Sequence, residues 1–83
     1  MAEPRIAFTN HAEEMLAERG IDRAWVIATI ESPEAIEIDP VRPGVMRAYR
    51  RIPEHGNRVL RVVHLPGDIV RVLTVFFDRR RRR

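Results

Sequence analysis

Three kinds of side chain in this 83-residue sequence could act together on a phosphate group: arginine, tyrosine and histidine. An arginine guanidinium binds phosphate through paired hydrogen bonds, and a tyrosine ring stacks on a nucleobase. Histidine exchanges a proton near neutral pH. The residues that we expect to supply this chemistry are Arg61, Tyr49 and His11 as catalytic groups, with Arg47, Arg51 and Arg19 as further contacts to a nucleic acid.

The grouping of these residues depends on how two predicted strands pair. Residues 45–52 and 58–65 read as strands joined by a five-residue loop, which places Ile52 opposite Arg58 and Tyr49 opposite Arg61. Because opposed residues of an antiparallel pair share a face, Arg47, Tyr49, Arg51 and Arg61 gather on one side of the sheet. A loop with an even number of residues would shift the pairing and reverse the face of the first strand. The alternative interpretation is a solvated sheet face without a ligand.

The other face of the predicted sheet is apolar. Pro66–Gly67 forms a turn into a strand at 69–77, and this turn pairs Leu65 with Asp68 and Arg61 with Val72. We therefore expect the apolar face to receive the helices. Its residues would be Met46, Ala48, Ile52, Leu60, Val62, Ile69, Leu73, Val75 and Phe77.

Two short helices precede these strands. After a first strand at 5–8, Thr9 or Asn10 caps a helix that Gly20 ends, and Asn10 with Glu13 fits a capping box. Asp22 caps a second helix, which stops at residues 32–33, where Ser precedes Pro. This second helix is apolar nearly all round, so we expect it to be buried, with its tryptophan in the core. Residues 35–40 form a weaker strand.

Each candidate residue has a structural alternative. Arg61 either stabilises charge on a scissile phosphate or serves as a cross-strand partner of Tyr49. His11 is either a general acid or base, or a helix-start residue hydrogen-bonded to a neighbouring strand. Arg19 lies near a helix C-terminus, where the helix dipole alone favours a positive charge.

The basic character of the sequence comes from its end. All fifteen basic residues are arginine, and five of them are residues 79–83, which we expect to form a disordered tail behind a single domain at 1–78. Without this tail, ten arginines face twelve acidic residues. Such a tail attracts polyanions or is simply solvated. The sequence has no cysteine, no metal-ligand spacing among its three histidines and no membrane-spanning apolar run, so we expect a cytoplasmic protein without a metal or cofactor.

Several short motifs, taken together, resemble a family of small bacterial and archaeal proteins known as a domain of unknown function. Its members run HA-x-x-R-M-x-x-RGI, then a helix ending near NP, a strand like LRVV and a last strand like TVY. Met15 stands where the family has a basic residue. The matching segments here are His11–Ala12, Arg19–Ile21, Ser32–Pro33, Leu60–Val63 and Thr74–Phe76.

This family looks like a branch of the RelE/ParE toxin superfamily. The resemblance implies an α+β fold in β-α-α-β-β-β order, with two N-terminal helices on one face of an antiparallel sheet. It implies a toxin-antitoxin-type protein with a cognate antitoxin, which acts as a metal-independent mRNA endonuclease on RNA or the ribosome, as RelE-like members do. ParE-like members bind DNA gyrase instead. The alternative is a non-catalytic module that binds protein or nucleic acid, because the sequence gives no firm pair of acid and base.

Overall fold

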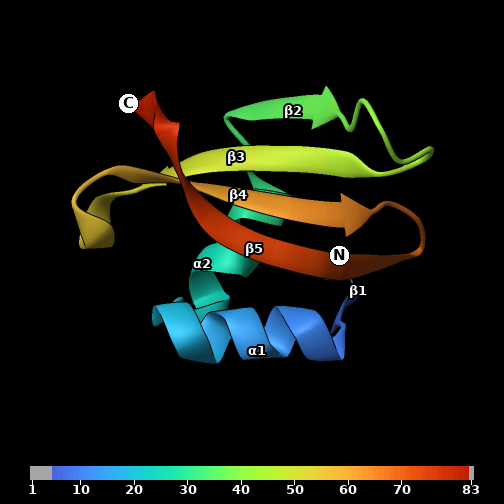
Figure 1. Ribbon diagram of the computed structural model, residues 1–83, viewed down its shortest axis with the longest axis horizontal. Helices are drawn as coiled ribbons and strands as arrows, with labels where there is room; N and C mark the ends of the chain where they lie inside the picture. Colours follow the sequence, from blue (N-terminus) through green and yellow to red (C-terminus); the bar gives the residue numbers. More distant parts are fainter. Residues whose placement is uncertain (1–4, 83) are drawn as a thin grey trace.

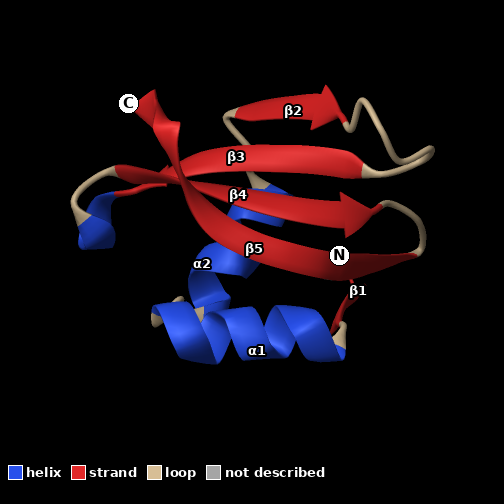
Figure 2. Ribbon diagram, viewed as in Figure 1, coloured by secondary structure: helices blue, strands red, loops and turns tan. Residues whose placement is uncertain are grey.

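The computed structural model describes residues 5–82, which form two helices and one five-stranded sheet (Figure 1). Both helices lie on the same side of the sheet (Figure 2). The fold class is therefore α+β, as expected. The elements are β1 (Arg5–Phe8), α1 (Asn10–Arg19), α2 (Arg23–Glu31), β2 (Ala35–Ile38), β3 (Met46–Ile52), a 3-10 turn η1 (Pro53–His55), β4 (Arg58–Leu65) and β5 (Ile69–Arg82).

The helix ends follow from local hydrogen bonding. The Thr9 side chain accepts a hydrogen bond from the Ala12 N–H (3.1 Å), so Thr9 is the N-cap of α1 and the capping box expected at Asn10 is not formed. Gly20 ends α1 in the left-handed conformation (φ 62°), which glycine adopts without steric cost. Asp22 caps α2 by accepting from the Ala24 N–H (2.9 Å).

The strand order is β1-β5-β4-β3-β2. β1 runs parallel to β5, whereas the other neighbours are antiparallel, so the sheet is mixed and not purely antiparallel as expected. The element order contains one more strand than the expected β-α-α-β-β-β series. The short β1 feeds directly into α1 through Thr9, whose N–H donates to the Val72 carbonyl of β5 (3.1 Å).

The predicted pairing of β3 with β4 is confirmed. Ile52 pairs with Arg58 and Tyr49 with Arg61, across a turn of five residues. Arg47, Tyr49, Arg51 and Arg61 therefore share one face of the sheet, which we call the arginine face. The opposite face, which carries Ala48, Ile52, Leu60 and Val62 against the helices, is the helix face.

The predicted pairing of β4 with β5 is wrong. Leu65 pairs with Arg71 instead of Asp68, and Arg61 pairs with Phe76 instead of Val72. Between the pairs Val63–Thr74 and His64–Val72, β5 has one extra residue. The residues of β5 before and after this position therefore alternate between the two faces in opposite phase. As a result, Val72 joins the core on the helix face together with Val75.

The core lies between the helices and the helix face. α1 contributes Ala12 and Leu16, whereas α2 contributes Val26. Trp25 is half-buried at the edge of this core and not inside it: its ring lies 5.4 Å from that of His55 and 6.3 Å from that of Phe77 (centroid distances). The further fully buried members are Ile21, Ala48, Ile52, Leu60, Val62, Val72 and Val75.

Four of the five C-terminal arginines, which we expected in a tail, belong to the end of β5 in the structure. β5 continues to Arg82, which pairs with Arg58 of β4, and Arg83 lies outside the described residues. Within residues 5–82, neither helix has the length and apolar character needed to cross a membrane.

Candidate nucleic-acid interface

Tyr49 is the centre of the arginine face. Neither helix covers this face, yet Tyr49 is only 2% exposed. Two guanidinium groups enclose the ring: the Cζ of Arg81 lies 3.8 Å from the ring centroid, and that of Arg61 lies 5.4 Å from it. Both contacts are within the range of a cation–π interaction. The ring is thus already stacked inside the protein and is not open to a nucleobase.

The Tyr49 hydroxyl also has a partner. It donates a hydrogen bond to Oε1 of Glu37 on β2 (3.0 Å), and Arg81 donates to the other carboxylate oxygen of Glu37. These hydrogen bonds, from Tyr49 first and Arg81 second, lower the pKa of Glu37. Glu37 therefore joins β2, β3 and the end of β5 through one ionised carboxylate.

Arg61 is held by a second carboxylate. Its Nη2 donates to Oδ2 of Asp78 (2.7 Å), and its guanidinium lies over the Phe76 ring (4.8 Å to the centroid). Burial would raise the pKa of Asp78, but the hydrogen bonds from Arg61 and from the Arg80 N–H lower it overall. The Nε of Arg61 is buried and has no hydrogen-bond partner among the described residues.

Arg47 and Arg51, the other predicted nucleic-acid contacts on this face, are paired as well. Nε of Arg47 lies 3.3 Å from Oδ2 of Asp39, and Nε of Arg51 lies 3.3 Å from Oε1 of Glu34. Asp39 also accepts the backbone N–H groups of two loop residues, and these bonds hold its pKa well below the usual range. Each of the predicted arginines on this face is therefore neutralised by a carboxylate.

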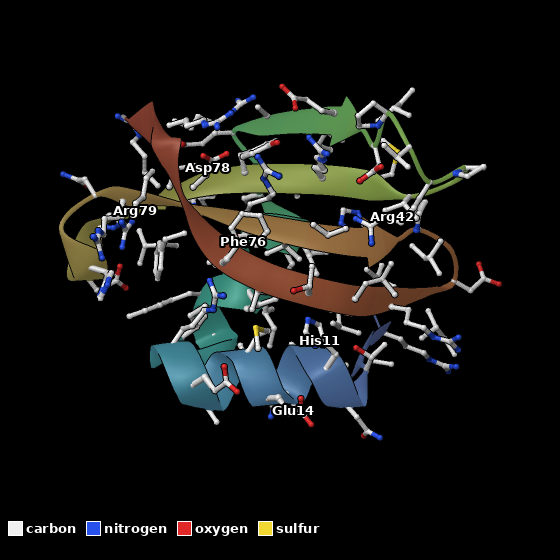
Figure 3. All side chains as sticks on the ribbon, in the orientation of Figure 1. His11, Glu14, Arg42, Phe76, Asp78 and Arg79 are labelled. Atoms are coloured by element: carbon white, nitrogen blue, oxygen red, sulfur yellow. The ribbon has the colours of Figure 1, made fainter. Side chains whose placement is uncertain are left out.

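A groove of about 690 Å³ opens beside this cluster. Leu60 of β4 pairs with Phe77, but Arg58 pairs with Arg82, so residues 78–81 of β5 leave the regular ladder. Figure 3 shows Asp78 and Arg79 on this terminal part of β5. The groove is lined by Gly56, Asn57, Arg58, Val59, Phe77, Asp78, Arg79 and Arg81. Three of these lining residues are arginines, so the groove is basic.

His11 and Arg19 do not belong to this site. Both lie on α1, which packs against the helix face, so the sheet separates them from Tyr49 and Arg61. Figure 3 shows His11 on α1, well away from Asp78 at the terminal part of β5. His11 is exposed, and the hydrogen bond expected from it to a neighbouring strand is made by Thr9, whose hydroxyl donates to the Leu73 carbonyl (3.1 Å). The expected catalytic set of Arg61, Tyr49 and His11 is thus not assembled.

Five residues of the site were not predicted from the sequence: Glu37, Arg58, Asp78, Arg79 and Arg81. Alternation in the β2 sequence would have placed Glu37 on the same face as Arg47, since the two residues oppose each other in the β2–β3 pair. No comparable pattern pointed to Asp78 or Arg81, because both follow the shifted part of β5.

The arrangement is suited to binding an anion. Arg58, Arg79 and Arg81 line the groove, and guanidinium groups match the geometry of phosphate. Within residues 5–82, no cluster of three histidine, aspartate or glutamate side chains is placed to hold a metal ion.

The comparisons with known proteins identify one family. A family model described as "Domain of unknown function (DUF4258)" matches residues 8–77, which is most of the chain. No curated protein and no solved structure matches the chain.

Proposed function

The chain belongs to this DUF4258 family, and we propose that it is a toxin-type domain of the RelE/ParE-like kind that binds RNA in the groove beside Tyr49. The observation that carries the proposal is that Arg58, Arg79 and Arg81 line one groove. Two of them belong to the C-terminal segment, which holds the surplus of positive charge. RNA offers a regular series of phosphates to such donors. The two helices followed by a run of strands are in keeping with the superfamily.

Affinity for RNA as a function of salt concentration tests this proposal. We expect a labelled single-stranded RNA to bind the wild type with a log–log salt slope of roughly 0.7 per contacted phosphate. Arg58→Ala and Arg79→Ala should each weaken binding and reduce the slope by about that amount. Arg19→Ala removes the same charge from α1 and is the matched control. Equal slopes for all three variants would contradict binding in the groove.

A ribonuclease activity is the second candidate, and the hydrogen bond between Tyr49 and Glu37 favours it. In a metal-independent cleavage, the 2′-hydroxyl attacks the adjacent phosphorus and the bond to the 5′-oxygen breaks. A base takes the 2′-hydroxyl proton, and an acid protonates the departing 5′-oxygen. Glu37 as base, Tyr49 as acid and Arg61 as the group that stabilises the charged phosphate would supply these roles. In this scheme Glu37 of β2 takes the role of base that we expected of His11, because His11 lies on α1 in the helix layer.

Expression of the wild type should then arrest growth, and RNA from these cells should carry new 5′-hydroxyl ends. Glu37→Gln and Tyr49→Phe should abolish the cleavage without abolishing the fold, as judged by circular dichroism. The purified protein should be assayed with and without ribosomes, and a cognate antitoxin should suppress the arrest. RNA binding without cleavage under all these conditions would leave a non-catalytic RNA-binding module.

A further inference from the structure

The arginine face is basic in sequence but largely neutral in structure. Its two guanidinium groups nearest to Tyr49 are each engaged by one carboxylate of the same chain: Arg81 by Glu37, and Arg61 by Asp78. Asp78 and Arg81 also line the groove. Any phosphate that approaches these guanidinium groups therefore meets carboxylates that already occupy the donors.

We propose that Glu37 and Asp78 are internal competitors of the RNA phosphates for Arg81 and Arg61, and that they set the affinity of the groove. This inference rests on the proposed function. A carboxylate presents two oxygens to a guanidinium much as a phosphate does, so the two anions exclude each other at the same fork. The competition lowers the affinity of the site for any single phosphate and favours a ligand that offers several phosphates at once.

Two features make the exchange physically feasible. The side chains of the Arg81–Glu37 pair are 38% and 44% exposed, so the pair separates into water without leaving a buried charge. The Tyr49 hydroxyl remains able to hold Glu37 in place after Arg81 has moved to the ligand.

The two ion pairs differ in how tightly they are held. Asp78 is more enclosed than Glu37, with a side chain 9% exposed, and it also accepts the Arg80 N–H (3.0 Å). Releasing Arg61 would leave the charged Asp78 carboxylate in an enclosed position, whereas Glu37 can be hydrated when Arg81 leaves it. We infer that Glu37 is the competitor that yields first.

Amide variants test the competition directly. Glu37→Gln and Asp78→Asn keep the side-chain shape and one oxygen acceptor but remove the charge. Binding of a fluorescent 2′-O-methyl oligouridine, which cannot be cleaved through its 2′-oxygen, would be measured by anisotropy. We expect each variant to bind about threefold or more tightly than the wild type, in line with the strength of an exposed ion pair.

Glu13→Gln is the matched control, because Glu13 pairs with Arg23 on the helix layer (2.7 Å) and loses the same charge on substitution. It should bind the oligonucleotide as the wild type does. An equal gain in Glu13→Gln would reduce the effect to net charge and overturn the inference, as would unchanged affinity in Glu37→Gln. Glu37 is exposed, so this variant keeps the test valid if Asp78→Asn folds poorly.

The failure of this inference can be told apart from that of the proposed function. If the wild type binds, Arg58→Ala binds more weakly and the amide variants show no gain in affinity, the competition alone is contradicted. No binding by the wild type or by any amide variant would sink both. Binding that appears only in the amide variants would support the competition strongly.

Discussion

Leu60 and Tyr49 lie on neighbouring strands and on opposite faces of the sheet, and they are 0% and 2% exposed. Leu60 lies in the apolar core between the sheet and the helices. Tyr49 is covered by the guanidinium groups of Arg61 and Arg81, which are in turn fixed by carboxylates. Two short helices can cover only one face of a five-stranded sheet. The other face of this small domain is closed by long, polar side chains with apolar stems.

The two faces differ in whether their contacts can be exchanged while the domain stays folded. Apolar packing on the helix face can be lost only by unfolding, since water has no competing interaction to offer. The ion pairs of the arginine face can exchange one anion for another without disturbing the core. Substitutions on the two faces should therefore differ in both the size and the kind of their effects.

The largest effect is expected on the helix face. Leu60→Ala removes a fully buried side chain and should lower the free energy of unfolding by about 2–5 kcal/mol. For a domain of this size, that is a large share of a total of roughly 4–12 kcal/mol. Urea unfolding followed by circular dichroism measures the loss. Ile69→Ala, at a position 50% exposed, is the control and should change stability by no more than about 0.5 kcal/mol.

The arginine face should respond to acid more than the helix layer, where Arg23 lowers the pKa of Glu13 alone among the described carboxylates. The pKa values of Glu34, Glu37, Asp39 and Asp78 are all lowered in the folded state. Their stabilisation is therefore fully present above the unfolded pKa values near 4, and it is lost as the pH falls toward the folded values. The melting temperature should decline below about pH 4. Asp39→Asn should flatten this decline, and an identical pH profile would exclude Asp39 as a source.

Removal of the last strand segment should expose Tyr49. A chain ending at Asp78 lacks Arg81 and with it the nearest cation over the ring. We expect the Tyr49 ring to become accessible to acrylamide in a tyrosine fluorescence measurement, with the emission read at wavelengths shorter than the emission of Trp25. Stability should fall by up to about 1 kcal/mol, the upper value for an exposed pair. A chain ending at Arg81 is the control and should retain the cover. Equal quenching of both chains would show that Arg81 does not shield the ring.

The smallest effect is expected at the rim of the arginine face. Arg51 and Glu34 form an exposed ion pair, with side chains 48% and 39% exposed. Arg51→Ala should therefore change the free energy of unfolding by about 0–1 kcal/mol, and the change should shrink in high salt. Chemical unfolding at two salt concentrations measures it. A loss comparable to that of Leu60→Ala would erase the contrast between the two faces.

The sequence predicted the β3–β4 hairpin because an odd loop length and the alternation of apolar residues agree there. It did not predict the β4–β5 pairing, because five residues and not two separate the first pair, Leu65 and Arg71, and because an extra residue then shifts the register between Val63 and His64. The error at Val72 has this origin. The helix caps could be predicted because a capping side chain accepts a hydrogen bond from a backbone N–H only two or three residues away. The sequence did not decide between Thr9 and Asn10 as the cap of α1.

The candidate site was predicted in part. Arg61 and Tyr49 were placed on the same face because that inference needs only local pairing. Their enclosure could not be foreseen, since Arg81 belongs to a run of identical arginines that reads as solvated chain. The contact between Arg81 and Glu37 joins residues 44 positions apart, which no local pattern encodes. His11 was misplaced because a short motif carries no information about which layer its helix occupies.

The pairing of β1 with β5 also governs how the chain acquires its structure. The N–H and hydroxyl of Thr9 bond to the carbonyls of Val72 and Leu73, so two stretches 64 residues apart must meet before the sheet is complete. Closing so long a loop reduces the conformational entropy of the chain before the contacts between its ends have formed, and this slows folding. β1 therefore has no partner in the sheet until β5, the last strand of the domain, is available. The domain cannot complete its sheet progressively from its N-terminal side.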